Sequence, residues 1–223
     1  MKYQNIVKGT FIKRPNRFIA HVLIDGKEEI CHVKNTGRCK ELLTSGATVL
    51  LEKSSNPSRK TAYDLISVYK KNRLINMDSQ APNKVADEWL RIRFPDTFIK
   101  NEKAWEDSRF DFYIENGEEK IFVEVKGVTL EKDGVVLFPD APTERGVKHI
   151  NGLIRWASEG NKAMVLFIVQ MNNVSFFTPN KETHPEFAEA LLRAKEQGVE
   201  VVAVDCEVGE NTLTFGKEIE IKF

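Results

Sequence analysis

From residue 8 to residue 71 the chain alternates between short apolar and polar runs that turn-forming residues interrupt. Alternation with a period of two is typical of strands that bury one face. Residues 36–46 are long enough for one or two helical turns. Five strands with this short helix after the third follow the order of an OB-type barrel, although an SH3-like barrel would give a similar pattern. The strands are predicted at residues 9–14, 16–25, 28–35, 47–53 and 62–70.

The pattern changes after residue 74, where apolar side chains recur at helical spacing and Pro82 lies near the first turn of a predicted helix. Helices are predicted at 82–93, 143–160 and 184–198. Strands interleaved with helices on this scale indicate an α/β domain with a mixed sheet flanked by helices. We therefore expect two domains, residues 1–80 and 81–223. The strands of the second are predicted at residues 98–106, 109–116, 120–130, 162–170, 173–180, 199–208 and 212–223.

The net charge of zero hides an asymmetry between the two halves of the chain. Residues 1–73 contain 15 Lys and Arg against 6 Asp and Glu, a net charge of +9, and the remaining residues carry 18 basic and 27 acidic side chains, a net charge of −9. The basic half is the candidate for binding an anion. Nucleic acid is the first interpretation, an acidic protein partner the second and simple solubility the third.

Other features of the sequence narrow the class of protein. Cys31, Cys39 and Cys206 are odd in number and scattered, which fits reduced, packed thiols of a cytosolic protein. No apolar run is long enough to span a bilayer, so we expect a cytoplasmic protein without a membrane partner. The histidines and cysteines lack the paired spacings of a zinc site, and His149 is interpreted as a packed or partly exposed helix residue. No glycine-rich phosphate loop supports a function that uses ATP.

A predicted hairpin at residues 109–126 brings two carboxylates together. By strand parity Asp111, Glu124 and Lys126 share one face, and Phe110 points to the other. A turn at residues 117 and 118 would place Asp111 directly opposite Glu124, and a turn at 116 and 117 would make them diagonal neighbours.

Two adjacent carboxylates in an apolar hairpin are costly unless a cation neutralises them. Mg²⁺, with Mn²⁺ as a substitute, would suit Asp111 and Glu124 as ligands. Lys126 could then steady an attacking water or a developing phosphoryl charge, and Glu88 or Asp87 of the predicted helix could assist. The competing interpretation is a solvated cluster of charges at the surface of a sheet.

A second polar cluster lies around the start of the helix at 143–160. Asp140 or Thr143 could simply cap this helix, with Glu144 in its first turn. In a functional interpretation, Arg145 and Lys148 meet phosphates beside the metal. The two interpretations are compatible.

Five stretches carry a specific family resemblance: VKNTGRCKELL, SNPSRKTAYDLI, SRFDFYIENGEEKIFVEVKGVTL, FPDAPTERGVKHI and GVEVVAVDCEV. In this order, and over nearly the full chain, the sequence resembles the sugar fermentation stimulation protein A family. The resemblance implies an OB-like domain followed by a restriction-endonuclease-like PD-(D/E)XK domain, DNA binding, and a role in regulating maltose metabolism. Asp111 and Glu124-Val125-Lys126 fall on the nuclease motif, with Phe110 where that motif often has Pro. Catalysis stays open.

Basic side chains of the first domain could track a phosphate backbone, with Phe18 or His32 stacking on a base, although core packing is the favoured interpretation of Phe18. No helix-turn-helix, zinc finger or basic zipper is present, so binding without sequence specificity is expected, to double- or single-stranded DNA or to RNA. Active Mg²⁺-dependent hydrolysis, binding without turnover and docking on an acidic protein are the competing hypotheses. The predicted nucleic-acid contacts are Lys13, Arg14, Lys34, Asn35, Arg38, Lys40, Arg59, Lys60, Arg145 and Lys148.

Overall fold

The computed structural model describes residues 1–35 and 37–223. Its N-terminal part is a sheet of six strands that closes on itself, because β3 pairs with β5 in parallel while the other neighbouring strands pair antiparallel. The closed barrel contains five strands in the order β1-β2-β3-β5-β4, which confirms the OB fold over the SH3-like interpretation. The strands are β1 (Ile6–Lys13), β2 (Ile19–Ile24), β3 (Lys27–Val33), β4 (Thr48–Lys53), β5 (Tyr63–Lys70) and β6 (Arg73–Asn76).

Two features of the barrel differ from the sequence-based expectation. The described residues of the segment predicted as a short helix form turns, in which Leu42 and Leu43 donate their N–H groups to the carbonyl of Cys39. Leu42 and Cys39 are buried, so the segment closes the barrel by packing without a helix. The second difference is β6, which was not predicted and extends the sheet from β5 toward the C-terminal part.

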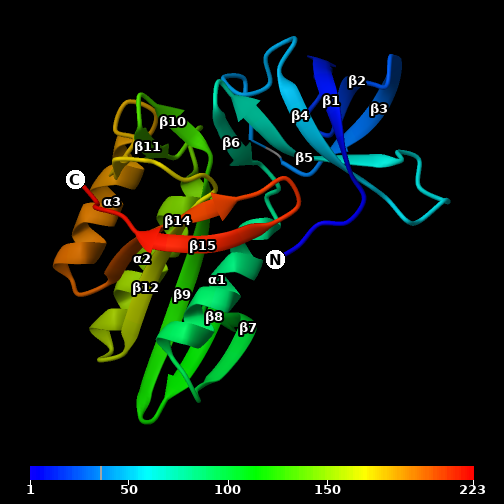
Figure 1. Ribbon diagram of the computed structural model, residues 1–223. Coiled ribbons are helices and arrows are strands. Elements are labelled where there is room, and N and C mark those ends of the chain that lie inside the picture. Colours follow the sequence, from blue (N-terminus) through cyan, green and yellow to red (C-terminus); the bar gives the residue numbers. More distant parts are fainter. Residues whose placement is uncertain (36) are drawn as a thin grey trace.

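The C-terminal part contains a second, mixed sheet of six strands in the order β15-β14-β12-β9-β8-β7 (Figure 1). The central strand β12 runs parallel to both of its neighbours, and the outer pairs are antiparallel hairpins. Because β12 is buried along nearly its whole length, its sequence is apolar on both faces. The strands are β7 (Phe98–Trp105), β8 (Ser108–Asn116), β9 (Glu119–Val128), β12 (Lys162–Val169), β14 (Glu200–Val208) and β15 (Leu213–Glu218).

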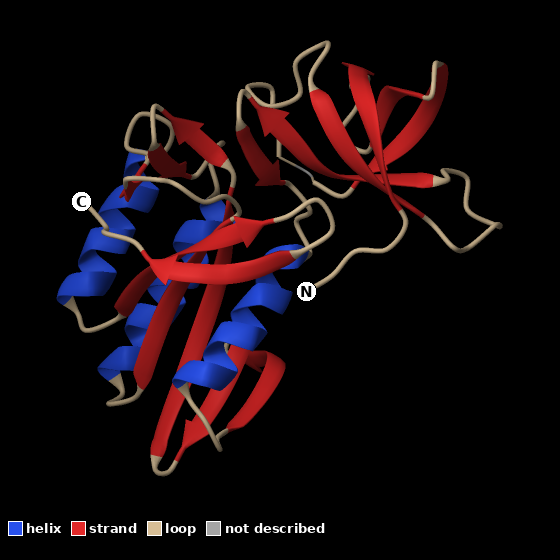
Figure 2. Cartoon of the chain, in the orientation of Figure 1, coloured by secondary structure: helices blue, strands red, loops and turns tan. Residues whose placement is uncertain are grey.

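Helices cover both faces of this sheet, and Figure 2 shows them confined to the C-terminal part. The helix α1 (Ala81–Arg93) packs on one face against β9, β12 and β15. On the other face α2 (Glu144–Ser158) packs against β8, β9 and β12, and α3 (Pro185–Glu196) packs against α2 and β14. The α/β layers expected from the pattern of the second half are therefore confirmed.

A small three-stranded sheet lies beside the large one. It pairs β11 (Val135–Phe138) with β10 (Leu130–Lys132) in a hairpin and with β13 (Phe176–Pro179) in parallel. The hairpin of β10 and β11 was not predicted, because the expected strand at 120–130 ended at the first residue of β10 and residues 131–138 were given no strand. Its turn at Asp133 and Gly134 has positive φ at both residues, as a type I′ hairpin turn requires.

Buried polar side chains join the two parts of the chain. The Gln170 amide donates to the Asn76 Oδ1 atom at 2.8 Å and to the Asp78 carbonyl at 3.0 Å. The Asn76 amide in turn donates to the hydroxyl of Tyr3 at 2.9 Å, and that hydroxyl donates to Asp78 at 3.3 Å. All four side chains are at most 5 % exposed, so this junction network is shielded from water.

Two general expectations can be compared with the fold. Cys31, Cys39 and Cys206 are all free and buried, as packed thiols should be. Among the described residues, no helix is both long and apolar enough to cross a bilayer.

Candidate functional site

Asp111 lies at the end of the ladder between β8 and β9. That ladder begins with the pair Asn116 and Glu119, so the turn consists of residues 117 and 118, the first of the two predicted registers. The last pair of the ladder is Phe112 with Val123, one residue before Asp111 and Glu124. The Asp111 carboxylate accepts the backbone N–H of Val125 at 2.8 Å. The side chain therefore holds β8 to β9 beside Glu124.

The strand faces around Asp111 differ from the predicted parity. Phe110 was expected on the face of Phe112, but its ring packs against Phe122 with 4.8 Å between centroids, on the side of α2. Phe112 instead belongs to the core under α1. Parity holds only within a continuous ladder, and the pairing of β8 with β9 is interrupted at Asp111, so the alternation changes there.

Glu124 is only 2 % exposed, and its two carboxylate oxygens have different surroundings. The Oε1 atom accepts from the Lys126 ammonium at 2.6 Å and from the Nδ1 atom of His149. The Oε2 atom is buried and has no hydrogen-bond partner among the described residues. Burial alone would raise the pKa of Glu124, but the hydrogen bond from His149 and the charge of Lys126 lower it overall. Glu124 is thus an ionised carboxylate with one free oxygen.

Asp111 has the opposite electrostatic balance. Burial and the nearby charge of Glu124 raise its pKa, and the hydrogen bonds from Val125 and Asn83 only partly oppose this. The Asn83 amide, which extends from the first turn of α1, donates to Asp111 at 2.9 Å. A second negative charge beside Glu124 is therefore unfavourable unless a cation is bound, which is the usual electrostatic condition of a paired-carboxylate site.

His149 and Asn83 are site residues that the sequence analysis did not identify. His149 is buried on α2, where its Nε2 atom accepts from the Arg145 side chain at 3.4 Å. The ring thus lies between Arg145 at Nε2 and Glu124 at Nδ1. No local motif signals either contact, because each joins elements far apart in the chain. The one relevant sequence feature was the spacing of Arg145 and His149 by four residues, which brings two side chains together on a helix.

The structure places Glu88 away from the role proposed for it. Its carboxylate accepts from the N-terminal ammonium of Met1 at 2.9 Å. Glu88 lies about 140° around α1 from Asn83, at 100° per residue, whereas Asn83 is the helix residue that contacts Asp111. Asp87, the other candidate of this helix, pairs with Arg91 at 2.9 Å.

The carboxylates suit a hard divalent cation. Carboxylate oxygens are the ligands that Mg²⁺ prefers, and it usually takes only one or two of them together with water and phosphate oxygens. The buried Oε2 atom of Glu124 lacks a partner that such a cation would supply. Residues 1–35 and 37–223 contain no cluster of three or more His, Cys, Asp or Glu arranged to hold a metal. With two carboxylates, Mg²⁺ would need water or phosphate oxygens as its other ligands.

Several predicted nucleic-acid contacts are instead used inside the fold. The Arg14 guanidinium donates to the carbonyls of Arg17, Asn35, Gly37 and Arg38 at 2.5 to 2.9 Å, so it holds the loop after β3. The Asn35 side chain spans the same loop, donating to the Met77 carbonyl and accepting from Gly37. Both side chains therefore hydrogen-bond main-chain groups of the fold.

Arg59 and Lys34 are also committed to an internal partner. Arg59 forms two hydrogen bonds to the buried carboxylate of Asp64, at 2.6 and 2.8 Å, and Lys34 lies 3.3 Å from it. His32 contacts the same carboxylate at 3.0 Å, so its predicted stacking on a base is not supported. Although burial raises the pKa of Asp64, these partners lower it to about 2. This ion cluster links β3, β5 and the loop before β5.

Other predicted contacts are exposed. Lys13, Arg38, Lys40, Lys60 and Arg145 are on the surface, and Lys148 is exposed but donates to the Asp107 carbonyl at 2.8 Å.

Phe18 is also exposed, at 54 %, so the core packing predicted for it is wrong. Residues 16–17 before β2 are exposed as well, which leaves this ring at the surface of the barrel.

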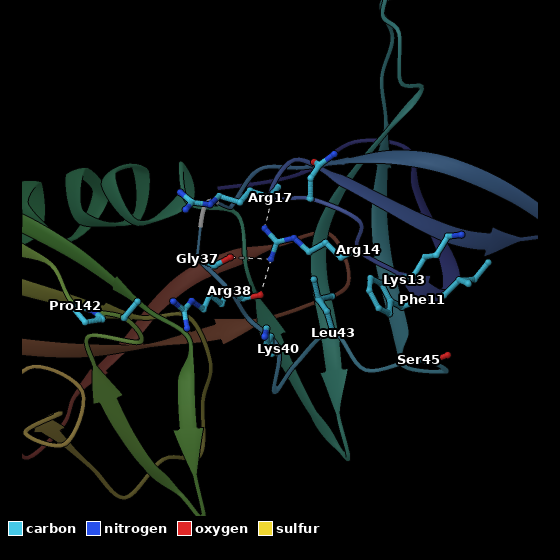
Figure 3. Close-up of a pocket in the computed structure, with 13 residues that line it drawn as sticks. Phe11, Lys13, Arg14, Arg17, Gly37, Arg38, Lys40, Leu43, Ser45 and Pro142 are labelled. Atoms are coloured by element: carbon cyan, nitrogen blue, oxygen red, sulfur yellow. Dashed lines mark hydrogen bonds between the residues drawn. The ribbon is translucent and has the colours of Figure 1, made fainter.

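Lys13, Arg38 and Lys40 line a groove of about 730 Å³ between the barrel and the C-terminal part (Figure 3). Arg17, which was not predicted as a contact, lines it too, and Arg14 forms part of its wall. The far side is Ala141 and Pro142, on the loop that leads into α2. No acidic side chain lines this basic groove among the described residues, so its charge favours a polyanion.

Comparisons with known proteins agree with this architecture. The family model described as the sugar fermentation stimulation protein RE domain matches residues 80–212, and the SfsA N-terminal OB domain matches residues 12–77. Sugar fermentation stimulation protein homologs of Desulfitobacterium hafniense and Ruminiclostridium cellulolyticum are 58 % and 55 % identical; each alignment covers 100 % of this chain, and 98 % and 100 % of the relative.

A solved structure is similar over the same extent. The structure of Pyrococcus furiosus SfsA in complex with Ca²⁺ superposes with a TM-score of 0.89 at 30 % identity, covering 100 % of this chain and 98 % of that one. Family models match most of the chain, and relatives above 50 % identity match along its full length. The chain belongs to the sugar fermentation stimulation protein family.

Proposed function

We propose that the protein binds DNA without sequence specificity and hydrolyses its phosphodiester bonds with a divalent cation, Mg²⁺ or Mn²⁺, held by Asp111 and Glu124. The observation that carries this proposal is the buried, unpartnered Oε2 atom of Glu124 beside Asp111 and Lys126. The family resemblance implies the Asp and Glu-x-Lys motif of PD-(D/E)XK nucleases at these residues, in a chain whose C-terminal part matches the family's RE domain.

The basic groove supplies the contacts to the DNA backbone. Lys13, Arg17, Arg38 and Lys40 line it, and they would neutralise successive phosphates and release their counterions. Arg145 is exposed, and its contact with His149 keeps it near the proposed metal site. There it would meet a phosphate next to the scissile one. Because these are contacts to phosphates, they position the polymer but do not read its sequence. Such binding in the cytoplasm would also be the physical basis of the role in maltose regulation that the resemblance implies.

The side chains around Glu124 have distinct roles in the proposed reaction. A bound divalent cation would polarise the phosphoryl oxygen and lower the pKa of a bound water. His149 contacts Glu124 and Asn83 donates to Asp111, and these hydrogen bonds orient the two carboxylates. The Lys126 ammonium, 2.6 Å from Glu124, is the donor available to orient the attacking water or to stabilise charge on the phosphate.

A second candidate is a DNA-binding protein that has kept this scaffold without turnover. One observation favours it: the helix residue next to Asp111 is the amide Asn83, and Glu88 is turned to the N-terminus, so two carboxylates are the acidic ligands at hand. A site with fewer charged ligands binds a cation more weakly. DNA binding is common to both candidates, and cleavage separates them.

The test is incubation of supercoiled plasmid with the purified protein in Mg²⁺, Mn²⁺ or EDTA. The control is the double variant Asp111→Asn, Glu124→Gln, which keeps the shape of both side chains and removes their charge. We expect metal-dependent nicking by the native chain and none by the variant, with a gel shift of the plasmid in every lane that contains protein.

The outcomes distinguish the candidates. A shift without nicking in any metal would support binding without turnover. Nicking that persists in the double variant would place the chemistry elsewhere, and the absence of a shift at low salt would refute DNA binding itself.

A further inference from the structure

A second cavity, of about 360 Å³, lies between the basic groove and the metal site. It shares Gly37, Ala141 and Pro142 with the basic groove, and it reaches Asn83 and Val125, which both contact Asp111. Its size is at the lower end of the range for small-ligand pockets. A polymer that runs from the groove to the metal site passes its mouth.

The cavity presents hydrogen-bond acceptors that the fold does not use. Gln170 lines it and is only 2 % exposed. The Gln170 amide nitrogen donates to Asn76 and Asp78, which fixes the orientation of the side chain. The Gln170 Oε1 atom accepts no hydrogen bond from the described residues. The atom lies against Gly127, where a Cβ would come within 2.8 Å of it. At the mouth, the exposed Asp140 carboxylate has no hydrogen bond or ion pair within residues 1–35 and 37–223.

The wall of the cavity is mixed, and one part of it is apolar. Pro82 lies on one side, and Leu137, Phe138 and Pro139 line it from the strand β11 and the loop after it. Apolar walls around a few oriented polar groups are the features with which enzymes hold a nucleobase taken out of the stack, because the walls contact its faces and the polar groups contact its edge. Acceptors at the edge select a base that carries a donor.

We propose that this cavity receives one unstacked nucleobase of the bound DNA, one that presents an exocyclic amino group to Gln170 and Asp140. The inference rests on the proposed DNA binding but not on cleavage. Phosphates held by the basic groove and by the metal site would flank the nucleotide, so its base can rotate into the cavity while its backbone stays in place. The purpose of the extrusion is to expose the adjacent phosphate to Asp111 and Glu124.

The test uses a self-complementary duplex that alternates 2-aminopurine and thymine. The 2-aminopurine fluorescence is quenched by stacking and rises when the base leaves the stack. Because every base pair contains the probe, extrusion of a base is detected in whichever register the protein binds. A fluorescein on one end gives the affinity by anisotropy in the same samples. Measurements in EDTA prevent cleavage. We expect a rise of about threefold per bound protein at saturation, since the base leaves the duplex on binding.

Thr129→Phe fills the cavity, because Thr129 lines it and makes no side-chain hydrogen bond within the described part of the chain. The matched control is Thr214→Phe, at an exposed position of the edge strand β15. We expect Thr129→Phe to lose at least about half of the fluorescence rise while anisotropy still reports a complex, and Thr214→Phe to keep the full rise. Asp140→Asn changes an exposed side chain, so it should fold even if Thr129→Phe does not, and it should lower the rise.

Two results would overturn the inference. Binding by anisotropy without a fluorescence rise in the native protein would show that no base is extruded, and it would leave the proposed DNA binding intact. A full rise in both Thr129→Phe and Asp140→Asn would place the unstacked base outside this cavity. If anisotropy shows no complex at all, the proposed function fails first and the inference fails with it.

Discussion

Arg59 provides a quantitative test of the structural role that its ion cluster gives it. The lowering of the Asp64 pKa from 3.8 to about 2 corresponds to about 2 kcal/mol of folding free energy at neutral pH. Arg59 makes the two short hydrogen bonds to this carboxylate, while Lys34 and His32 make the other contacts. Arg59 is partly exposed, so solvent screening reduces its share. We therefore expect Arg59→Ala to destabilise the protein by about 1 kcal/mol.

The pH dependence has a definite sign. A carboxyl with a lowered pKa in the folded state stabilises the fold above its unfolded pKa, and this contribution is lost as the pH falls from about 4 toward 2. Urea unfolding of the native chain and of Arg59→Ala, near pH 7 and near pH 3, should show a difference that shrinks in acid. Lys60→Ala is the matched control, because Lys60 is exposed and has no ion pair among the described residues. An Arg59→Ala effect no larger than that of Lys60→Ala, or one independent of pH, would refute the reasoning.

Three further predictions address the basic groove, the carboxylate site and the junction between the two parts. Arg38→Ala should weaken DNA binding equally for all sequences and flatten the logarithmic salt slope by about one, as measured by anisotropy across salt concentrations; an unchanged slope would contradict its assignment to the groove. His149→Ala should cost about 2 kcal/mol in urea unfolding, because buried Glu124 loses a donor; a neutral effect would contradict this. Burial raises the pKa of Glu131, but the Lys70 hydrogen bond and other partners lower it to about 2. In the same assay, Lys70→Ala should therefore lower the free energy of unfolding by about 1 kcal/mol near pH 7 and by less near pH 3. A loss of stability that does not become smaller in acid would count against the ion pair.

Local patterns predicted the barrel and the hairpin of the candidate site well. Alternation defined the five barrel strands, and the parity of β9 placed Glu124 and Lys126 on one face, where they form an ion pair. Of the two predicted candidates for the helix cap, Asp140 and Thr143, it is Thr143 whose hydroxyl accepts from the Gly146 N–H at 3.1 Å. In each case the interaction joins residues close in the chain, or a ladder whose register a short turn determines.

Contacts between distant elements were not predictable in the same way. The role of a basic side chain depends on what the fold brings to it, and for that reason Arg14 and Arg59 could not be distinguished from Arg38 by composition. The contact of His149 with Glu124 joins residues 25 apart, which no spacing rule covers. Phe110 was placed on the wrong face because the ladder is interrupted one residue later.

The junction network also determines how a polymer could fit the protein. Tyr3, Asn76, Asp78 and Gln170 form a shielded set of hydrogen bonds, so a hinge motion between the barrel and the sheet would expose and break several of them together. We therefore expect the two parts to resist motion relative to each other. The shape change needed to bring a phosphate from the groove to Asp111 would fall on the duplex. Affinity should then vary with how easily a DNA bends or kinks, and flexible pyrimidine–purine steps would be favoured although the side chains of the basic groove contact only phosphates.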